Sequence, residues 1–318
     1  MFDFVSKKKY TMILSALIIL AGIVAMVVRG GLNLDVQFRG GTRIEIEMEN
    51  GDFDADKAGS VASDAIGGKR VIGQKSSTLD ANQDNKNVDF LVLTSSGKLS
   101  DEERNTVIEA IKSQFSIKEE NGHMQVRDVD PSIGAELKNR GLLAVFVAAI
   151  MLLLYVWIRF NIMSGLLAGL TAVIALIHDI AIMVSVYAIF NIPVNESFIA
   201  AVLTILGYSI NDTIVIYDRI RENSRFSRKD TIDGLVNKSI TQSMSRTINT
   251  TVTTVLCVLT IFLFAVYNGI GSIQEFTFPL LIGLVAGTYS SIFIASPLWV
   301  ALRQREANKK AGAKPAKA

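Results

Sequence analysis

Six long runs of apolar residues divide this chain, and a polar stretch separates the first run from the other five. Each run approaches the ~20 residues that a helix needs to cross the ~30 Å hydrocarbon core of a bilayer. The pattern therefore predicts a polytopic α-helical membrane protein with six transmembrane helices. The expected spans are Thr11–Val28, Gly141–Ile158, Ile162–Phe190, Phe198–Tyr217, Thr247–Val266 and Phe278–Leu302.

The polar stretch, residues 31–140, has the periodicity of an α+β domain. Apolar and polar residues alternate in its predicted strands, acidic residues begin its first predicted helix, and Ser100 and Glu103 form a capping box at its second. We expect strand, helix, strand, strand, helix and strand over Thr42–Glu49, Asp54–Ile66, Arg70–Gln74, Val88–Thr94, Ser100–Phe115 and Met124–Val129, with a polar loop over Gln74–Asn87. The order βαββαβ predicts a ferredoxin-like fold.

Charge is distributed unevenly along the 318 residues, of which 50% are hydrophobic and 19% charged. The stretch 31–140 holds 14 Lys/Arg and 20 Asp/Glu. The other ends of the spans carry 17 Lys/Arg, at 7–9, 159, 218–246 and 303–318, whereas the short loops 191–197 and 267–277 carry none. Since basic loops stay in the cytoplasm, both termini are expected there and the α+β domain outside.

Four regions follow from this reasoning. Residues 1–30 form the cytoplasmic N-terminus and the first span, 31–140 the external domain, 141–302 spans two to six, and 303–318 a basic cytoplasmic tail. The single cysteine, Cys257, falls inside the fifth span, so the external domain is expected to fold without a disulfide.

An acidic residue, Asp212, lies inside the fourth apolar run. A charge at bilayer depth costs at least ~2.5–3.5 kcal/mol, which makes such a residue a candidate functional site. Arg246 begins the fifth run at a depth that Asp212 can reach, and facing polar stripes on the two helices would form a hydrophilic path. The supporting polar residues are Tyr208, Asn211, Asn249 and Thr250. The alternative is a static ion pair that fixes the register of the helices.

His178 and Asp179 are adjacent near the middle of the third run. Neighbours on a helix point about 100° apart, so we expect one of the two to face the bundle interior. The pair could relay protons, and a histidine that hydrogen-bonds a neighbouring helix is an equal alternative.

Other features favour structure over chemistry. The chain has no nucleotide-binding glycine fingerprint, metal-ligand cluster or nucleophile with a positioned base, so we expect neither an enzyme nor a cofactor, metal or nucleic-acid site. The segment Phe38–Thr42, with Gly40 and Gly41, is expected to turn the chain from the first span into the sheet, and direct contact with a substrate is the alternative. The basic segment Asp218–Ser245 is expected to be a loop that anchors the bundle against anionic lipid or a partner. Four glycines suit close helix packing: Gly165, Gly169, Gly283 and Gly287.

Two segments carry a resemblance to a known family. Gly207–Asn223, with its Asn-Asp pair and its Asp-Arg-x-Arg-Glu-Asn motif, and Ser239–Thr250 closely resemble the SecF family of the bacterial Sec protein-export machinery. The similarity covers essentially the whole chain. One departure is Gln37, which stands where the family usually has an acidic residue before a Phe-x-Gly-Gly turn, while Asp35 lies two residues earlier.

The resemblance implies a bacterial inner-membrane subunit that pairs with SecD as half of an RND-like assembly of twelve spans. Family members use the proton or sodium gradient to promote export of unfolded preproteins through SecYEG, and YajC is a candidate further partner. By position, Asp212 would bind the proton and Arg246 would be its charge partner.

Two rivals stay open at this point. A small-molecule efflux half-transporter of the RND type would share the fold, but such pumps normally have two large external domains and both six-span halves in one chain. A passive assembly or insertion chaperone would need no titrating group, and it predicts that a neutral isostere at Asp212 is harmless.

Overall fold

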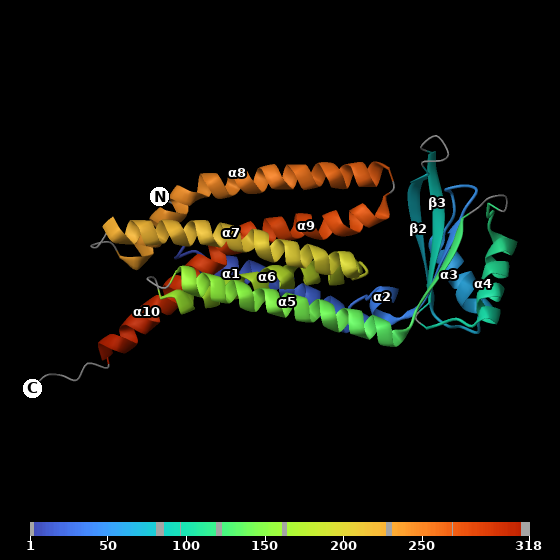
Figure 1. Cartoon of the computed structure of the whole chain (residues 1–318), viewed down its shortest axis with the longest axis horizontal. Helices are drawn as coiled ribbons and strands as arrows, with labels where there is room; N and C mark the ends of the chain where they lie inside the picture. The colour runs from blue at the N-terminus through green and yellow to red at the C-terminus, as the bar shows by residue number, and fades with distance from the viewer. Residues whose placement is uncertain are drawn as a thin grey trace, which may run out of the picture.

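The computed structural model describes residues 3–80, 86–95, 97–118, 123–160, 164–226, 231–268 and 270–312. A bundle of long helices carries a small sheet domain at one end (Figure 1). Within these ranges, six helices are long and apolar enough to span a membrane, as the sequence predicts. They are α1 (Lys8–Arg29), α5 (Pro131–Arg159), α6 (Gly165–Phe190), α7 (Glu196–Phe226), α8 (Ile232–Tyr267) and a last one made of α9 (Gly271–Ser290), a π-helical segment (Ser291–Ala295) and α10 (Ser296–Gly312).

The sheet domain lies between α1 and α5. After the four-residue helix α2 (Val36–Arg39), it runs β1 (Gly41–Glu47), α3 (Ala55–Ala65), β2 (Val71–Asp80), β3 (Lys86–Ser95), α4 (Asp101–Gln114) and β4 (Met124–Val129). The strand order is β2-β3-β1-β4 and every neighbouring pair is antiparallel. This is the ferredoxin-like arrangement that the βαββαβ order predicts.

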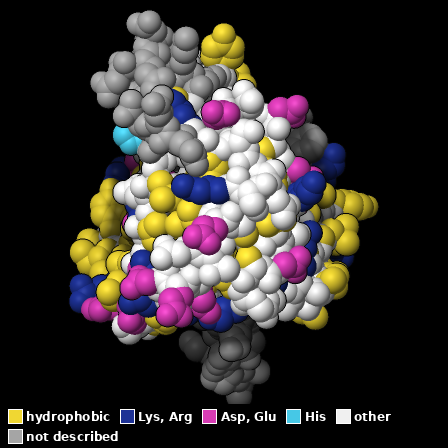
Figure 2. Space-filling view, turned by 90° about the vertical axis from the view of Figure 1, so that its right-hand side faces the viewer, with side chains coloured by type: hydrophobic (Ala, Val, Ile, Leu, Met, Phe, Trp, Pro, Cys, Tyr) yellow, Lys and Arg dark blue, Asp and Glu magenta, His cyan; other side chains and the backbone are white. Residues whose placement is uncertain are grey.

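Alternation along the central strands gives the domain its own core. Ile44 and Ile46 of β1 and Leu91 and Leu93 of β3 are buried on the face that α3 and α4 cover. The capping box of α4 is present, with Ser100 and Glu103 each bonded to the other's backbone N–H. At this end of the molecule, Lys/Arg and Asp/Glu side chains are interspersed over the described surface (Figure 2).

Two segments predicted as loops are largely regular structure. β2 and β3 pair continuously from Val71↔Ser95 to Asp80↔Lys86, so most of the predicted polar loop is strand, and residues 81–85 lie outside the described residues. A hairpin ladder satisfies backbone groups even where the side chains are polar, which hydrophobic alternation does not reveal.

The predicted basic loop Asp218–Ser245 is also mostly helical. α7 continues to Phe226 and α8 begins at Ile232. Ion pairs three residues apart, Arg221 with Asp218 and Arg219 with Glu222, both at 2.6 Å, support the solvated end of α7.

In the bundle, α6, α7 and α9 are the most buried spans, while α1, α5 and α8 lie at the periphery. The predicted glycine contacts are present. A Cβ on Gly283 would lie 2.5 Å from the Ile205 side chain, and one on Gly287 would lie 2.8 Å from Ser209 Cβ, so both glycines let α9 approach α7. Gly40 and Gly41 turn the chain into β1 with φ of 76° and 138°.

Candidate functional site

Two carboxylates are buried among the membrane-spanning helices. Asp212 lies on α7 with 2% of its surface exposed, and Asp179 lies on α6 with none exposed. Both stand beside α9, whose close approach to α7 at Gly287 brings the hydroxyls of the segment Thr288–Ser291 into reach.

Asp212 has one hydrogen-bond donor in the described structure. Thr288 Oγ1 donates to Asp212 Oδ2 at 3.3 Å, and Thr288 Oγ1 itself lies 2.6 Å from Thr251 Oγ1 of α8. The three side chains join α7, α9 and α8. A single long hydrogen bond is weak compensation for taking an ionised carboxylate out of water.

Arg246 does not form an ion pair with Asp212 in the part of the chain that the structure describes. Its side chain lines a hollow of about 570 Å³ between α7 and α8, at the end of the bundle remote from the sheet domain. Asn211 lines the same hollow, whereas the next residue, Asp212, is buried. The basic and acidic residues of the hollow are Asp218, Arg219, Arg221, Glu222, Arg225 and Arg246.

One residue of the predicted stripe on α7 contacts α8, but at Thr254, which lies outside the predicted stripe on α8. Tyr208 Oη of α7 donates to Thr254 Oγ1 of α8 at 3.4 Å. Thr250 bonds the main-chain oxygen of Arg246, and Asn249 is exposed. The polar face of α8 is thus open along most of its length.

His178 and Asp179 both face the interior, which corrects the expectation that only one would. Asp179 points toward α7 and α9, where Ser209 and Ser290 donate to its Oδ2 at 2.7 and 3.0 Å. His178 points toward α1, and its Nδ1 also reaches Asp179 Oδ1 at 3.1 Å. α6 packs against α1 as well as against α7 and α9. Side chains on two different faces of α6 are therefore buried.

Comparison with known proteins gives the family. A sequence profile described as protein export membrane protein SecD/SecF, C-terminal, matches residues 109–305. The chain belongs to the SecD/SecF family. The protein translocase subunit SecF of Alicyclobacillus acidocaldarius is 35% identical over 97% of this chain and 95% of its own length.

Longer members of the SecD/SecF family match as well. The protein translocase subunit SecDF of Bacillus subtilis is 34% identical, and the match covers 96% of this chain and 39% of that protein. The crystal structure of SecDF from Thermus thermophilus, described as a translocon-associated membrane protein, has a TM-score of 0.77 at 30% identity, over 96% of this chain and 39% of that chain. This chain therefore corresponds to about two fifths of the SecDF proteins.

Sequence reasoning missed the hydroxyl residues that surround the carboxylates of this SecD/SecF-family chain. Ser15, Ser209, Thr251, Thr288 and Ser290 are spread over four helices, and single serines and threonines are common in transmembrane helices. The run Thr288-Tyr289-Ser290-Ser291 was the available signal, since it places four hydroxyls inside an apolar span.

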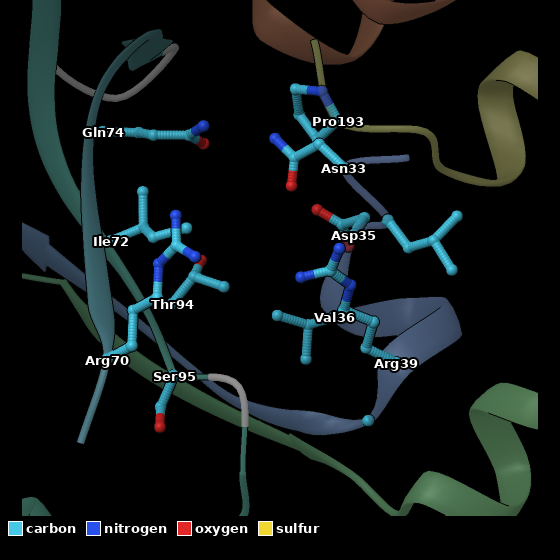
Figure 3. A pocket seen from close by; sticks show the side chains of 12 residues that line it. Asn33, Asp35, Val36, Arg39, Arg70, Ile72, Gln74, Thr94, Ser95 and Pro193 are labelled. Carbon is cyan, nitrogen blue, oxygen red and sulfur yellow. The ribbon is translucent and has the colours of Figure 1, made fainter. Parts of the chain in front are cut away.

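The open face of the sheet meets the end of the bundle across a small pocket of about 40 Å³ (Figure 3). Thr94 belongs to β3 and Arg70 directly precedes β2, whereas Asp35 and Pro193 come from the connections beside the spans. Gln37, the departure from the family pattern, lies near this pocket and makes two hydrogen bonds to Glu196. Its Nε2 donates to Glu196 Oε1 at 3.4 Å, and its Oε1 accepts from the Glu196 main-chain N–H at 3.3 Å. Gln37 thus ties α2 to the start of α7.

Proposed function

We propose that this chain is an accessory subunit of the bacterial Sec translocase which, with SecD, uses the proton or sodium gradient to promote protein export through SecYEG. The observation that carries the proposal is Asp212, a carboxylate 2% exposed on a spanning helix with one hydrogen-bond donor at 3.3 Å. Membership of the SecD/SecF family supplies the substrate, an exported polypeptide.

Asp212 suits proton binding because neither protonation state is strongly fixed by its surroundings. Burial among apolar helices disfavours the charge, while Thr288 Oγ1 stabilises it. The hollow between α7 and α8 is lined by Asn211, the residue directly before Asp212, and by Arg246. A small movement of α8 would bring the guanidinium closer and favour the ionised form.

The open side of α7 and α8 is where we infer the partner binds. Asn211, Arg246 and Asn249 are exposed on spanning helices, and polar groups facing hydrocarbon are expensive. The SecDF relatives, of which this chain matches 39%, supply a partner of the right kind in SecD. The assembled complex would bind SecYEG, YajC and the unfolded preprotein.

The orientation belongs to the same proposal. Basic residues gather at the end of the bundle remote from the sheet domain, among them Arg219, Arg221 and Arg246, and the tendency of basic loops to stay in the cytoplasm favours a cytoplasmic position for both termini. The sheet domain then lies outside, where the preprotein emerges, in the inner membrane of a bacterial cell.

The decisive experiment replaces Asp212 by Asn in the assembled complex. Asn has the same shape and can still accept from Thr288, so the fold is retained, but it cannot bind and release a proton. We expect gradient-stimulated export in membrane vesicles to fall to the level measured without a gradient. Glu196→Gln is the matched control, because it removes an exposed carboxylate from the start of the same helix and keeps an oxygen that can accept from Gln37 Nε2.

Full gradient stimulation in Asp212→Asn, at equal abundance of the complex, would contradict the proposal and favour a passive assembly chaperone. Loss of small-molecule efflux with unaffected export would favour the RND-type transporter instead. The names of the relatives, all translocase subunits, favour export over either rival.

A further inference from the structure

A second polar network lies apart from Asp212, around the buried pair His178 and Asp179. The Asp179 carboxylate is enclosed, accepts hydrogen bonds from Ser209 and Ser290 on Oδ2, and has His178 Nδ1 at 3.1 Å from Oδ1. When the carboxylate is ionised it only accepts, and Nδ1 then carries the hydrogen. Three donors give the buried charge the compensation that Asp212 lacks.

The other ring nitrogen of His178 faces α1. Nε2 lies 2.9 Å from Ser15 Oγ, Ser15 Oγ lies 3.4 Å from Tyr289 Oη, and Tyr289 Oη donates to the Thr11 carbonyl at 2.7 Å. In a neutral imidazole Nε2 accepts from Ser15. In an imidazolium Nε2 donates to Ser15. Ser15 can then donate to Tyr289, which donates to the Thr11 carbonyl.

Few other ionisable groups approach the ring. Tyr289 of α9 stacks on it, with ring centroids 6.0 Å apart, and α1 presents Ser15 and the Thr11 main chain. From α7, Ser209 reaches Asp179, and Asp212 follows one turn later on the same helix. No Lys or Arg takes part in this network among the described residues.

The network also joins two parts of the molecule. α1 leads through Gly30 and Gly31, with φ of 75° and 130°, to the sheet domain. On the other side, Ser209 and Ser290 belong to the helices that hold Asp212 and its donor Thr288.

We propose that His178 and Asp179 form a second proton-binding site, and that Ser15 couples its protonation state to α1. When a proton from water binds Nε2, Ser15 must change from donor to acceptor and turn its own hydrogen toward Tyr289. The hydrogen bonds between α1 and α6 reverse their direction, and no covalent bond other than the N–H of the bound proton forms or breaks. Only the coupling to export rests on the proposed function; the proton site does not.

The proton site can be observed directly, because the chain has two histidines and the other, His123, is exposed in the sheet domain. His123→Gln leaves His178 as the single imidazole for nitrogen-15 NMR in lipid bilayers. We expect one protonated ring nitrogen at high pH, two at low pH, and a midpoint that Asp179→Asn moves down by at least about one pH unit through loss of the opposite charge. A ring that keeps one form from pH 5 to 9, or a midpoint that Asp179→Asn leaves in place, would overturn the proton site.

The coupling is tested with Ser15→Ala. We expect this variant to shift both the NMR midpoint of His178 and the pH profile of gradient-stimulated export. Ser185→Ala is the control: Ser185 packs against Gly22 of α1 at the same helix interface, but among the described residues its hydroxyl bonds only the Ala181 carbonyl of its own helix.

Two further outcomes separate the proposals. A Ser15→Ala variant with the wild-type midpoint and pH profile would overturn the coupling. A His178 titration in a wild-type complex whose export ignores the gradient would support the proton site and overturn the export function.

Discussion

Glu47, the last residue of β1, shows at the scale of one residue how a buried charge is held in the sheet domain. It is 2% exposed and accepts from Lys118 Nζ at 2.6 Å and from the His123 N–H at 2.8 Å. Burial raises the pKa of the Glu47 carboxyl, but these hydrogen bonds outweigh it and hold the pKa below its ordinary value. The ion pair ties the chain after α4 back to the centre of the sheet.

Glu47→Gln should therefore destabilise the domain in a pH-dependent way. Because the folded-state pKa is lowered, the stabilisation is complete above the unfolded value of about 4.3 and is lost as the pH falls through the folded value. We expect about 1–3 kcal/mol of destabilisation at pH 7, shrinking in acid. Pulse proteolysis of the full chain in urea would measure it.

The exposed carboxylate Glu109 of α4 supplies the control, since Glu109→Gln should leave the urea midpoint unchanged at every pH. Equal effects of the two substitutions, or a Glu47→Gln effect independent of pH, would show that the ion pair with Lys118 does not stabilise the domain.

At the scale of elements, the contact of α9 with α7 positions both buried carboxylates. Gly287 lies against Ser209, and the helix changes to π geometry directly after Ser290. π-helical turns frequently occur at functional sites, where the extra residue re-aims side chains. Here the turn begins at Ser291, whose Oγ lies 2.8 Å from Thr213 Oγ1 of α7.

Gly287→Ala should separate these two helices. Its new methyl group would lie 2.8 Å from Ser209 Cβ, too close for packed atoms, so overpacking of about 1–3 kcal/mol is expected. Thermal unfolding of the detergent-solubilised complex would report the loss. Gly207→Ala on α7 has no atom within 4 Å and should be neutral or slightly stabilising. Equal melting temperatures for wild type and Gly287→Ala would exclude this role for the glycine.

At the scale of the whole molecule, the sheet domain touches the bundle mainly through small seams. One is the pocket at Asp35 and Arg70, and another brings β2 to the start of α9, where a Cβ on Gly271 would lie 3.6 Å from Ser76 Oγ. A proton crossing 100 mV supplies about 2.3 kcal/mol, enough to shift a two-state equilibrium about fifty-fold. Rocking of the domain against the bundle is within that range, whereas unfolding it is not.

A disulfide between Ser76→Cys and Gly271→Cys is expected to lock this seam, since a Cβ at position 271 would lie 3.6 Å from Ser76 Oγ, the atom that the new sulfur replaces. The background needs Cys257→Ser, because Cys257 is exposed. We expect oxidation to abolish gradient-stimulated export and a reductant to restore it, with the single-cysteine variants unaffected. Undiminished export with the disulfide fully formed would exclude domain motion at this seam.

The sequence alone determined the architecture. Apolar runs as long as a bilayer is thick predict six spans, and alternation between Thr42 and Val129 predicts the ferredoxin-like order, because both signals come from residues close together in the chain. It also singled out Asp212, since a carboxylate inside an apolar run is exceptional wherever it points.

The tertiary structure decided which polar groups meet. It placed Arg246 beside the hollow without an ion pair to Asp212, turned both His178 and Asp179 inward, and continued a polar hairpin as strand. These outcomes depend on contacts between helices or strands far apart in sequence, such as Ser15 with His178 and Asp179 with Ser290. Periodicity within one helix gives the direction of a side chain but not the neighbour it reaches, because only packing brings the second helix to it.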